Sequence, residues 1–382
     1  MDAAPDAAAL RELFRLEPDV AFLNHGSYGA CPRPVFERYQ AWQRELERQP
    51  VEFLGRRLEG LLDDARAVLA AELGAEAGDL VFAPNATAAL NTVARSLHLQ
   101  PGDEILTTDH EYGALELTWE FVARKTGARY VRQPVPIPAR SPEEVVEAVW
   151  AGRTERTRVL FLSHVSSRTA LRFPVEELCR RAQGAGILSV VDGAHAPGQI
   201  PLDLAALGAD VYGGNCHKWL CAPKGSGFLW ARPEHQPWIE PAVVSWGYAP
   251  GQPFAERRHW QGTGDPAAYL SVPAAIDFQR EHGWDEVRDR CHELVREARR
   301  AITGWTGLEP PAPDSRDWFV QMASLPLPPC DAEEVQRRLR EEHRIEIPVF
   351  EWNGRQLVRV SVQGYNSAGD VEALVEALPH VL

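Results

Sequence analysis

Lysine is almost absent from this chain. The 40 Lys and Arg residues include only three lysines, Lys125, Lys218 and Lys224. Arginine replaces lysine well on a solvated surface, but it cannot form a Schiff base because its guanidinium group stays protonated. Imine chemistry with a carbonyl cofactor needs an amine that can lose its proton. The few remaining lysines are therefore candidates for a chemical role.

The chain also lacks the features of membrane and secreted proteins. No run approaches 18 apolar residues, so we expect no transmembrane helix. Residues 1–10 have neither a basic region nor an apolar core, which argues against a signal peptide. The cysteines follow no disulfide or metal-binding spacing, so we expect no metal and a reducing, cytoplasmic location. The six are Cys31, Cys179, Cys216, Cys221, Cys291 and Cys330.

Basic residues are fewer than acidic residues, 40 Lys and Arg against 54 Asp and Glu. The formal net charge is −14 over 382 residues, which argues against nucleic acid or an anionic membrane as a general partner. The length predicts two or three domains.

Short apolar runs alternate with helical stretches over much of the chain. This alternation predicts an α/β domain with a mainly parallel sheet. The last two runs are too close for a crossover helix, so we expect them to pair antiparallel. The runs lie near 80–83, 104–108, 129–135, 158–163, 187–191, 210–212 and 227–231.

The remaining segments indicate a second, smaller α+β domain. Residues 35–73 show the apolar spacing of one or two helices, and 236–266 form a linker rich in proline, glycine and aromatics. We predict three parts: an N-terminal segment of the small domain (1–20), a large domain (21–265) and a small C-terminal domain (266–382). Within the last we expect helical structure over about 267–304, a strand over 318–325, a helix over 331–343, strands over 345–351 and 356–362, and a helix over 368–381.

Lys218 has the neighbours that a pyridoxal phosphate (PLP) site needs. A short β-branched run ends at Asp192, and Lys218 lies just after the next run. In such a site, the acid keeps the pyridine nitrogen protonated and the lysine holds the cofactor as an imine. The alternative is a surface lysine in a loop.

Eight short motifs then occur in one order along residues 20–366. They are Phe22–Gly26, Pro84–Thr87, Thr108–Tyr112, Ser163–Ser167, Asp192–His195, His217–Lys218, Gly262–Gly264, and Arg359–Ser361 with Tyr365-Asn366. With these motifs in this order, the chain resembles the class V aminotransferase family of fold-type I PLP enzymes, and in particular its isopenicillin N epimerase-like branch. The resemblance implies a large PLP-binding α/β domain, a smaller α+β domain, and a homodimer with shared active sites.

The resemblance also assigns cofactor contacts. It places the PLP phosphate at Asn85, Ala86 and Thr87, where a helix N-terminus offers free N–H groups; a plain helix cap is the alternative. The other implied cofactor-binding residues are His110 on the ring face, Ser167 and His195 near the 3-oxygen, Asp192 at the ring nitrogen, Asn215, His217, Lys218, and Thr263 toward the neighbouring subunit. Asn215 and Ser167 depart from the serine and asparagine common in the family.

Substrate contacts follow in the same way. An arginine inside the apolar run around Arg359 is costly unless paired, and a substrate α-carboxylate would pair with it bidentately. An internal salt bridge is the alternative. The resemblance adds Asn24 and His25 to the substrate site. We expect His110 and Tyr112 to act in catalysis with Lys218 and Asp192, because Tyr112 could deliver a proton to Cα or to a leaving sulfur.

The reaction stays open between epimerisation, C–S lysis and transamination of an amino-acid substrate. A cysteine desulfurase is disfavoured, because no cysteine follows Cys330, which itself precedes a predicted helix. A non-catalytic binding protein of this fold is the alternative from another class. The presence of Lys218, Asp192 and Arg359 together argues against it.

Overall fold

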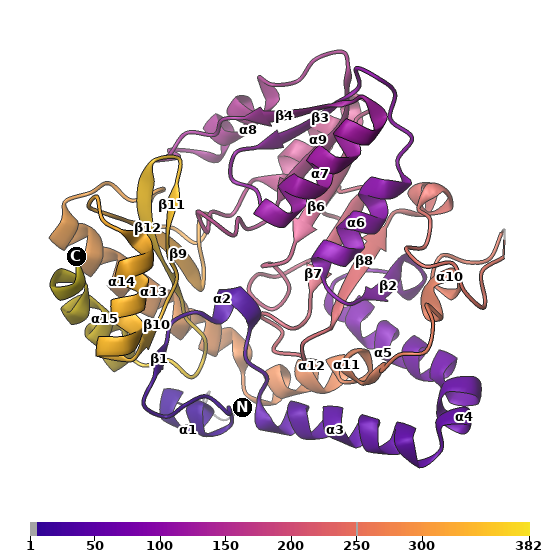
Figure 1. The fold of residues 1–382 in the computed structure, drawn as a ribbon, viewed down its shortest axis with the longest axis horizontal. Coiled ribbons are helices and arrows are strands. Elements are labelled where there is room, and N and C mark those ends of the chain that lie inside the picture. Colours follow the sequence, from indigo (N-terminus) through magenta and orange to yellow (C-terminus); the bar gives the residue numbers. More distant parts are fainter. Residues whose placement is uncertain (1–5, 250) are drawn as a thin grey trace.

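The computed structural model describes residues 6–249 and 251–382. Residues 1–5 of the predicted N-terminal segment and residue 250 of the predicted linker lie outside the described residues. Figure 1 shows a central sheet flanked by helices, with the C-terminal strands and helices packed to one side of it. The short helix α2 (His25–Tyr28) lies between these two parts.

The central sheet has seven strands in the order β2-β8-β7-β6-β5-β3-β4. The five strands from β7 to β4 are parallel, which confirms the predicted α/β class. Strands β7 and β8 are antiparallel, as expected from their short connection. The strands are β2 (Leu80–Ala83), β3 (Glu104–Thr108), β4 (Arg129–Gln133), β5 (Thr157–Ser163), β6 (Leu188–Gly193), β7 (Val211–Asn215) and β8 (Gly227–Ala231).

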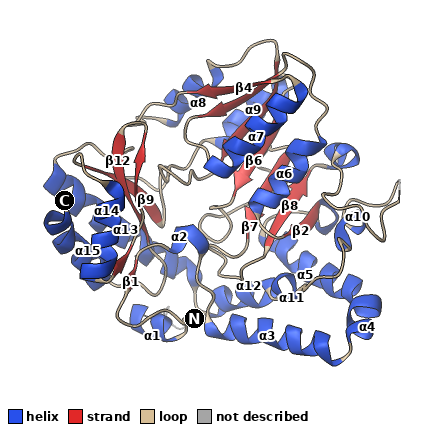
Figure 2. Cartoon of the chain, in the orientation of Figure 1, coloured by secondary structure: helices blue, strands red, loops and turns tan. Residues whose placement is uncertain are grey.

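Both faces of this sheet are buried under helices (Figure 2). Val190 packs in a cluster with residues of α6 and α7, whereas Val191 packs on the opposite face with residues of α8 and α9. Burial on both faces explains the nearly continuous apolar runs of the strands. These helices are α6 (Ala86–Ser96), α7 (Gly113–Thr126), α8 (Pro142–Trp150) and α9 (Val175–Gly184).

The segment before the sheet is helical, as predicted for 35–73. It breaks near Pro50, and a π-helical turn at Phe53–Arg57 follows. The segment comprises α1 (Ala7–Glu12), β1 (Ala21–Phe22), α2, α3 (Arg33–Arg48), α4 (Pro50–Glu52) and α5 (Leu58–Glu72). Strand β1 pairs in parallel with β10 (Ile345–Glu346), so the N-terminal segment contacts the C-terminal part as far as Phe22. The three-part domain division stays a prediction.

The C-terminal part confirms most of the expected elements and corrects two of them. Residues 318–321 are not strand, and β9 begins at Met322. The expected strand 345–351 is two strands on either side of Pro348, which has no N–H for a ladder. Beyond α10 (Glu256–His259), the elements are α11 (Ala267–Leu270), α12 (Val272–Glu281), α13 (Trp284–Thr306), β9 (Met322–Leu327), α14 (Ala332–His343), β10, β11 (Val349–Trp352), β12 (Arg355–Ser361) and α15 (Ala368–Val381).

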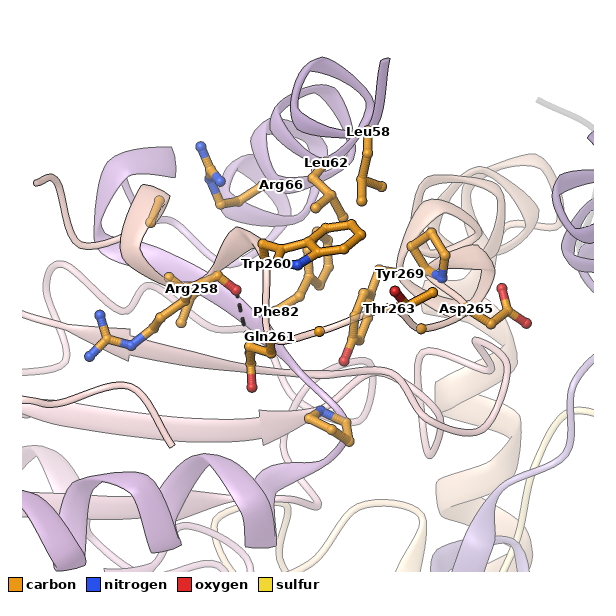
Figure 3. A pocket seen from close by; sticks show the side chains of 16 residues that line it. Leu58, Leu62, Arg66, Phe82, Arg258, Trp260, Gln261, Thr263, Asp265 and Tyr269 are labelled. Carbon is orange, nitrogen blue, oxygen red and sulfur yellow. Dashed lines mark hydrogen bonds between the residues drawn. The ribbon is translucent and has the colours of Figure 1, made fainter. Parts of the chain in front are cut away.

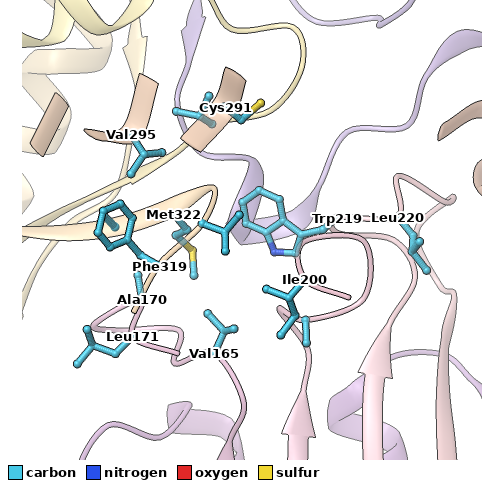
Figure 4. Packing of buried hydrophobic residues seen from close by; sticks show 14 of the residues in the cluster. Val165, Ala170, Leu171, Ile200, Trp219, Leu220, Cys291, Val295, Phe319 and Met322 are labelled. Carbon is cyan, nitrogen blue, oxygen red and sulfur yellow. The ribbon is translucent and has the colours of Figure 1, made fainter. Parts of the chain in front are cut away.

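One buried cluster joins the two parts near the site. Figure 4 shows Trp219, from the loop after β7, among apolar side chains that include Met322 of β9 and Cys291 of α13. Trp219 is fully buried, so the loop that carries Lys218 is held by packing. Over the described residues, no helix combines the length and apolar character needed to cross a membrane.

Candidate active site

The carboxyl ends of β5, β6 and β7 meet at one edge of the sheet and form the floor of a cavity of about 450 Å³. Ser163 is paired in register with Asp192, and β7 ends at Asn215, next to them. The cavity brings together ten of the predicted site residues: Asn85, Ala86, Thr87, Tyr112, Ser167, Asp192, His195, Asn215, His217 and Lys218. Ligands of open α/β sheets bind at this edge.

Lys218 loses its proton easily, and its neutral amine has a hydrogen-bond donor in His195. The Trp219 Nε1–H donates to His195 Nδ1 at 3.2 Å, and an indole nitrogen can only donate. Burial and the charge of Lys218 hold the pKa of His195 well below its usual value. Neutral His195 therefore carries its proton on Nε2, which lies 3.1 Å from Lys218 Nζ and donates to it. Burial and the positive charge of Arg359 lower the pKa of Lys218 to about 7.

Asp192 is buried at the end of β6. Burial raises its pKa to about 6, although the Ala194 N–H donates to Oδ1 at 2.9 Å and opposes the rise. A cationic nitrogen placed against this carboxylate would favour its ionised form. Asp192 therefore fits the ring nitrogen of PLP.

The N-terminus of α6 offers donors to the same cavity. Asn85 caps the helix by accepting from Ala88 N at 2.8 Å, and Asn215 Oδ1 accepts from Ala86 N at 2.8 Å. Within the described residues the Thr87 N–H has no hydrogen-bond partner, and the Nδ2 of Asn215 is left to donate. These groups suit a phosphate at a helix N-terminus. Asn215 stands where the family commonly has a serine, and its Nδ2 group still provides a hydrogen-bond donor at this position.

Arg359 is a buried guanidinium that no carboxylate neutralises within the described residues. Nη1 donates to Ser167 O at 2.6 Å and Oγ at 3.2 Å, and Nη2 donates to Ser27 Oγ at 2.9 Å. The Nε group is buried without a partner. Burial lowers the pKa of Arg359 to about 10. The alternative of an internal salt bridge is not realised within the described residues. Arg359 itself does not line the Lys218 cavity, but its hydrogen-bond partners Ser27 and Ser167 do.

The two residues predicted to contact substrate from the N-terminal loop do not line the cavity. His25 is fully buried, donates from Nε2 to the backbone oxygen of Lys218 at 2.9 Å, and contacts Tyr365 Oη through Nδ1 at 2.9 Å. Asn24 bonds Glu346 and accepts from Ser27 Oγ at 2.6 Å. Both residues hold the groups that reach the cavity.

His110 also lies away from the cavity, in contrast to its predicted place on the ring face. Its Nδ1 contacts Thr169 Oγ1 at 2.7 Å, and its Nε2 contacts Val135 O at 2.9 Å. Phe173 and Trp352 pack against its ring, so the imidazole is fully enclosed. Tyr112, at the start of α7, is the aromatic side chain of this motif that lines the cavity.

Thr263 lies in a different cavity, of about 240 Å³. Figure 3 shows Thr263 with Trp260 and Tyr269 near Leu58 and Leu62 of α5. Within one chain it therefore does not complete the Lys218 site.

Sequence reasoning did not single out Ser27 or Trp219. Ser27 binds Arg359 across 332 residues of sequence, and Trp219 fixes the tautomer of His195. The only local hint of a role for Ser27 is its position in the loop after Asn24. The only local hint for Trp219 is its position beside Lys218.

Comparison with known proteins agrees with this geometry. The model of the family described as aminotransferase class-V matches residues 30–374. The chain belongs to the class-V aminotransferase family. The resemblance stated from the motifs is confirmed, as are the PLP-dependent enzyme and its cofactor.

Three similar proteins illustrate the family. An isopenicillin N epimerase of Amycolatopsis lactamdurans is 44% identical, over 97% of both chains. A probable chloroplastic L-cysteine desulfhydrase of Arabidopsis thaliana is 30% identical, over 95% of this chain and 83% of that protein. An apo cysteine desulfurase structure from Thermococcus onnurineus NA1 covers 100% of this chain and 99% of that one, with a TM-score of 0.86 and 22% identity. The last comparison confirms the fold.

Proposed function

We propose that the protein inverts the Cα configuration of an amino-acid substrate. The observation that carries this proposal is Arg359, a buried cation without a carboxylate partner in the described chain, whose charge lowers the pKa of Lys218. A substrate bound through its α-carboxylate there would lie beside the neutral amine of Lys218. Isopenicillin N, the compound named for the 44% identical relative, is the first substrate to test.

The residues have distinct tasks in this proposal. PLP supplies an electron sink for the bond that breaks at Cα. Asp192 holds the ring nitrogen, and Thr87 with Asn215 holds the phosphate. Lys218 accepts the Cα proton as a neutral amine.

Inversion needs a second acid on the other side of Cα, and Tyr112 suits this role. Tyr112 lines the same cavity from the start of α7, and it lies near enough to Arg359 to oppose the lowering of that arginine's pKa. Its phenol can return a proton from a direction that Lys218 does not occupy.

A β-eliminating C–S lyase is the second candidate. The 30% identical relative named as a desulfhydrase favours it, and the same Lys218 would start that reaction. No cysteine lines the cavity in the described part of the chain, which supports neither reaction over the other but disfavours a persulfide route.

The deciding experiment is incubation with isopenicillin N and with single enantiomers of amino acids in deuterium oxide. Epimerisation should incorporate one deuterium at Cα and yield both configurations by chiral chromatography. Release of an α-keto acid and ammonia without inversion would favour elimination. Lys218→Ala should abolish either result, and Lys125→Ala, an exposed lysine of α7, is the matched control.

We further propose a homodimer with shared active sites. Thr263 cannot complete the site of its own chain, and the nearby segment exposes Val244 by 67% and Trp246 by 85%. A second copy covering these side chains would bring its own Thr263 toward the phosphate end of the cavity. All six cysteines are free thiols, which supports the proposed location in the reducing cytoplasm.

A further inference from the structure

Glu111 is a buried carboxyl group with no task in the proposed reaction. It follows β3 and is fully buried. Its Oε1 accepts from Thr108 Oγ1 at 2.7 Å, and its Oε2 contacts Ser163 Oγ at 2.6 Å. Within residues 6–249 and 251–382 no basic side chain forms an ion pair with it. A carboxyl group that is buried without an ion-pair partner is either neutral, or its ionised form is strongly destabilised.

Glu111 reaches the active site through one hydroxyl group. Ser163 ends β5, lines the cavity and is the register partner of Asp192 on β6. Paired residues of neighbouring strands have their side chains on the same face of the sheet. The hydroxyl of Ser163 therefore stands beside the carboxylate that we assign to the ring nitrogen.

Asp192 and Glu111 lose their protons at different pH values. Burial, with the negative charge of Asp192 adding to it, raises the pKa of Glu111 to about 8. Burial raises the pKa of Asp192 only to about 6, and Lys218 favours its ionised form. Tyr130 of β4 is the other titratable neighbour, and its pKa is raised by burial and by Glu111. At neutral pH Asp192 carries the charge and Glu111 keeps its proton.

The proton on Glu111 decides what Ser163 offers to the cavity. A neutral carboxyl group donates one hydrogen bond and accepts others. Thr108 Oγ1 already accepts from the His110 N–H at 3.1 Å, whereas Ser163 Oγ has no other partner in the described chain. Thr108 keeps donating to Oε1, and Ser163 Oγ, whose two lone pairs are both unused, accepts from neutral Glu111 and leaves its own hydrogen for the cavity. Ionised Glu111 instead binds that hydrogen.

We propose that Glu111 is a positioning residue that acts through Ser163, turning the Ser163 hydroxyl hydrogen toward the cofactor ring when protonated and withdrawing it when ionised. This proposal rests on the proposed PLP site at Asp192 and Lys218. In this proposal the protonation state of a buried acid controls whether a hydrogen-bond donor faces the cofactor ring.

The test is a pH titration of the absorbance of the PLP-loaded protein, without substrate. Glu111→Gln is the informative variant, because an amide has one accepting and one donating end, like the neutral acid. We expect a spectral transition near pH 8 in the wild type. Glu111→Gln and Ser163→Ala should lose this transition. Glu116→Gln, a partly buried acid of α7, should keep it.

Thermal melting of the cofactor-free protein provides a second readout. The folded state holds the Glu111 proton more tightly than the unfolded state, so its stability falls as pH rises toward the raised pKa. Between about pH 5 and about pH 8 the melting temperature of Glu111→Gln should therefore fall less than that of the wild type.

The outcomes separate the two proposals. A transition near pH 8 that survives in Glu111→Gln overturns the role of Glu111. A Glu111→Gln spectrum that matches the alkaline wild type at every pH also overturns it, since the ionised form would then be the native one. A wild type whose bound PLP is not attached to Lys218 refutes the proposed site instead, and the melting comparison still decides whether Glu111 titrates.

Discussion

Replacing Arg359 by alanine tests the proposed carboxylate site most directly. The variant should bind PLP as the wild type does, since none of the side chains that we assign to the ring or phosphate is changed. The Michaelis constant for the amino-acid substrate should rise sharply. The reason is that Arg359 is the buried cation beside Lys218 whose Nε has no partner in the described chain.

The structure sets the size of the effect. Two neutral serines already occupy part of the guanidinium, and the Nε–H with the remaining Nη hydrogens is left for a substrate carboxylate. Truncating one partner of a buried, hydrogen-bonded charge pair costs roughly 2–5 kcal/mol. Because the two serines already bind part of the guanidinium, we expect a cost of about 3 kcal/mol, which corresponds to roughly a 150-fold loss in kcat/KM.

Steady-state kinetics over a range of substrate concentrations measures this loss. Arg359→Lys should lie between wild type and alanine, because an ammonium group keeps the charge but not the fork of donors. Arg355→Ala, an exposed arginine on the same strand, is the control and should be nearly neutral. An unchanged Michaelis constant in Arg359→Ala would show that the α-carboxylate binds elsewhere.

Three further predictions concern the cofactor and the assembly. Asp192→Asn should keep bound PLP but lose on the order of 10²–10³ in turnover, because an amide does not hold the charge of the ring nitrogen; near-wild-type turnover contradicts this. The rate at which the cofactor-free protein captures PLP should rise as pH passes about 7 and Lys218 becomes neutral, and stopped-flow absorbance measures it. A rate independent of pH there would mean that the amine is not held near this pKa. Light scattering should give about twice the mass of one chain, and an active, PLP-loaded monomer would exclude the role of Thr263 across subunits.

The motif order and the strand pattern were enough to predict the family, the parallel sheet and the pair of Lys218 with Asp192. Lysine scarcity reduced the candidates to three, and the neighbouring strand end with Asp192 favoured Lys218. His110 was expected on the ring face because the family resemblance implies a histidine there. Side chains two residues apart after a strand end need not point the same way, and Phe173 and Trp352 enclose the imidazole.

The sequence by itself determined the kind of chemistry, because residue type and chain order are enough to put an amine and an acid at adjacent strand ends. Only the tertiary structure decided the states of these groups. The lowered pKa of Lys218 depends on burial and on Arg359, the proton position on His195 depends on the Trp219 indole, and the lack of an ion pair at Arg359 depends on which acids fail to reach it. Burial, hydrogen-bond direction and the distance between charges depend on residues far apart in the chain, and these set whether each group is a donor, an acceptor or an ion.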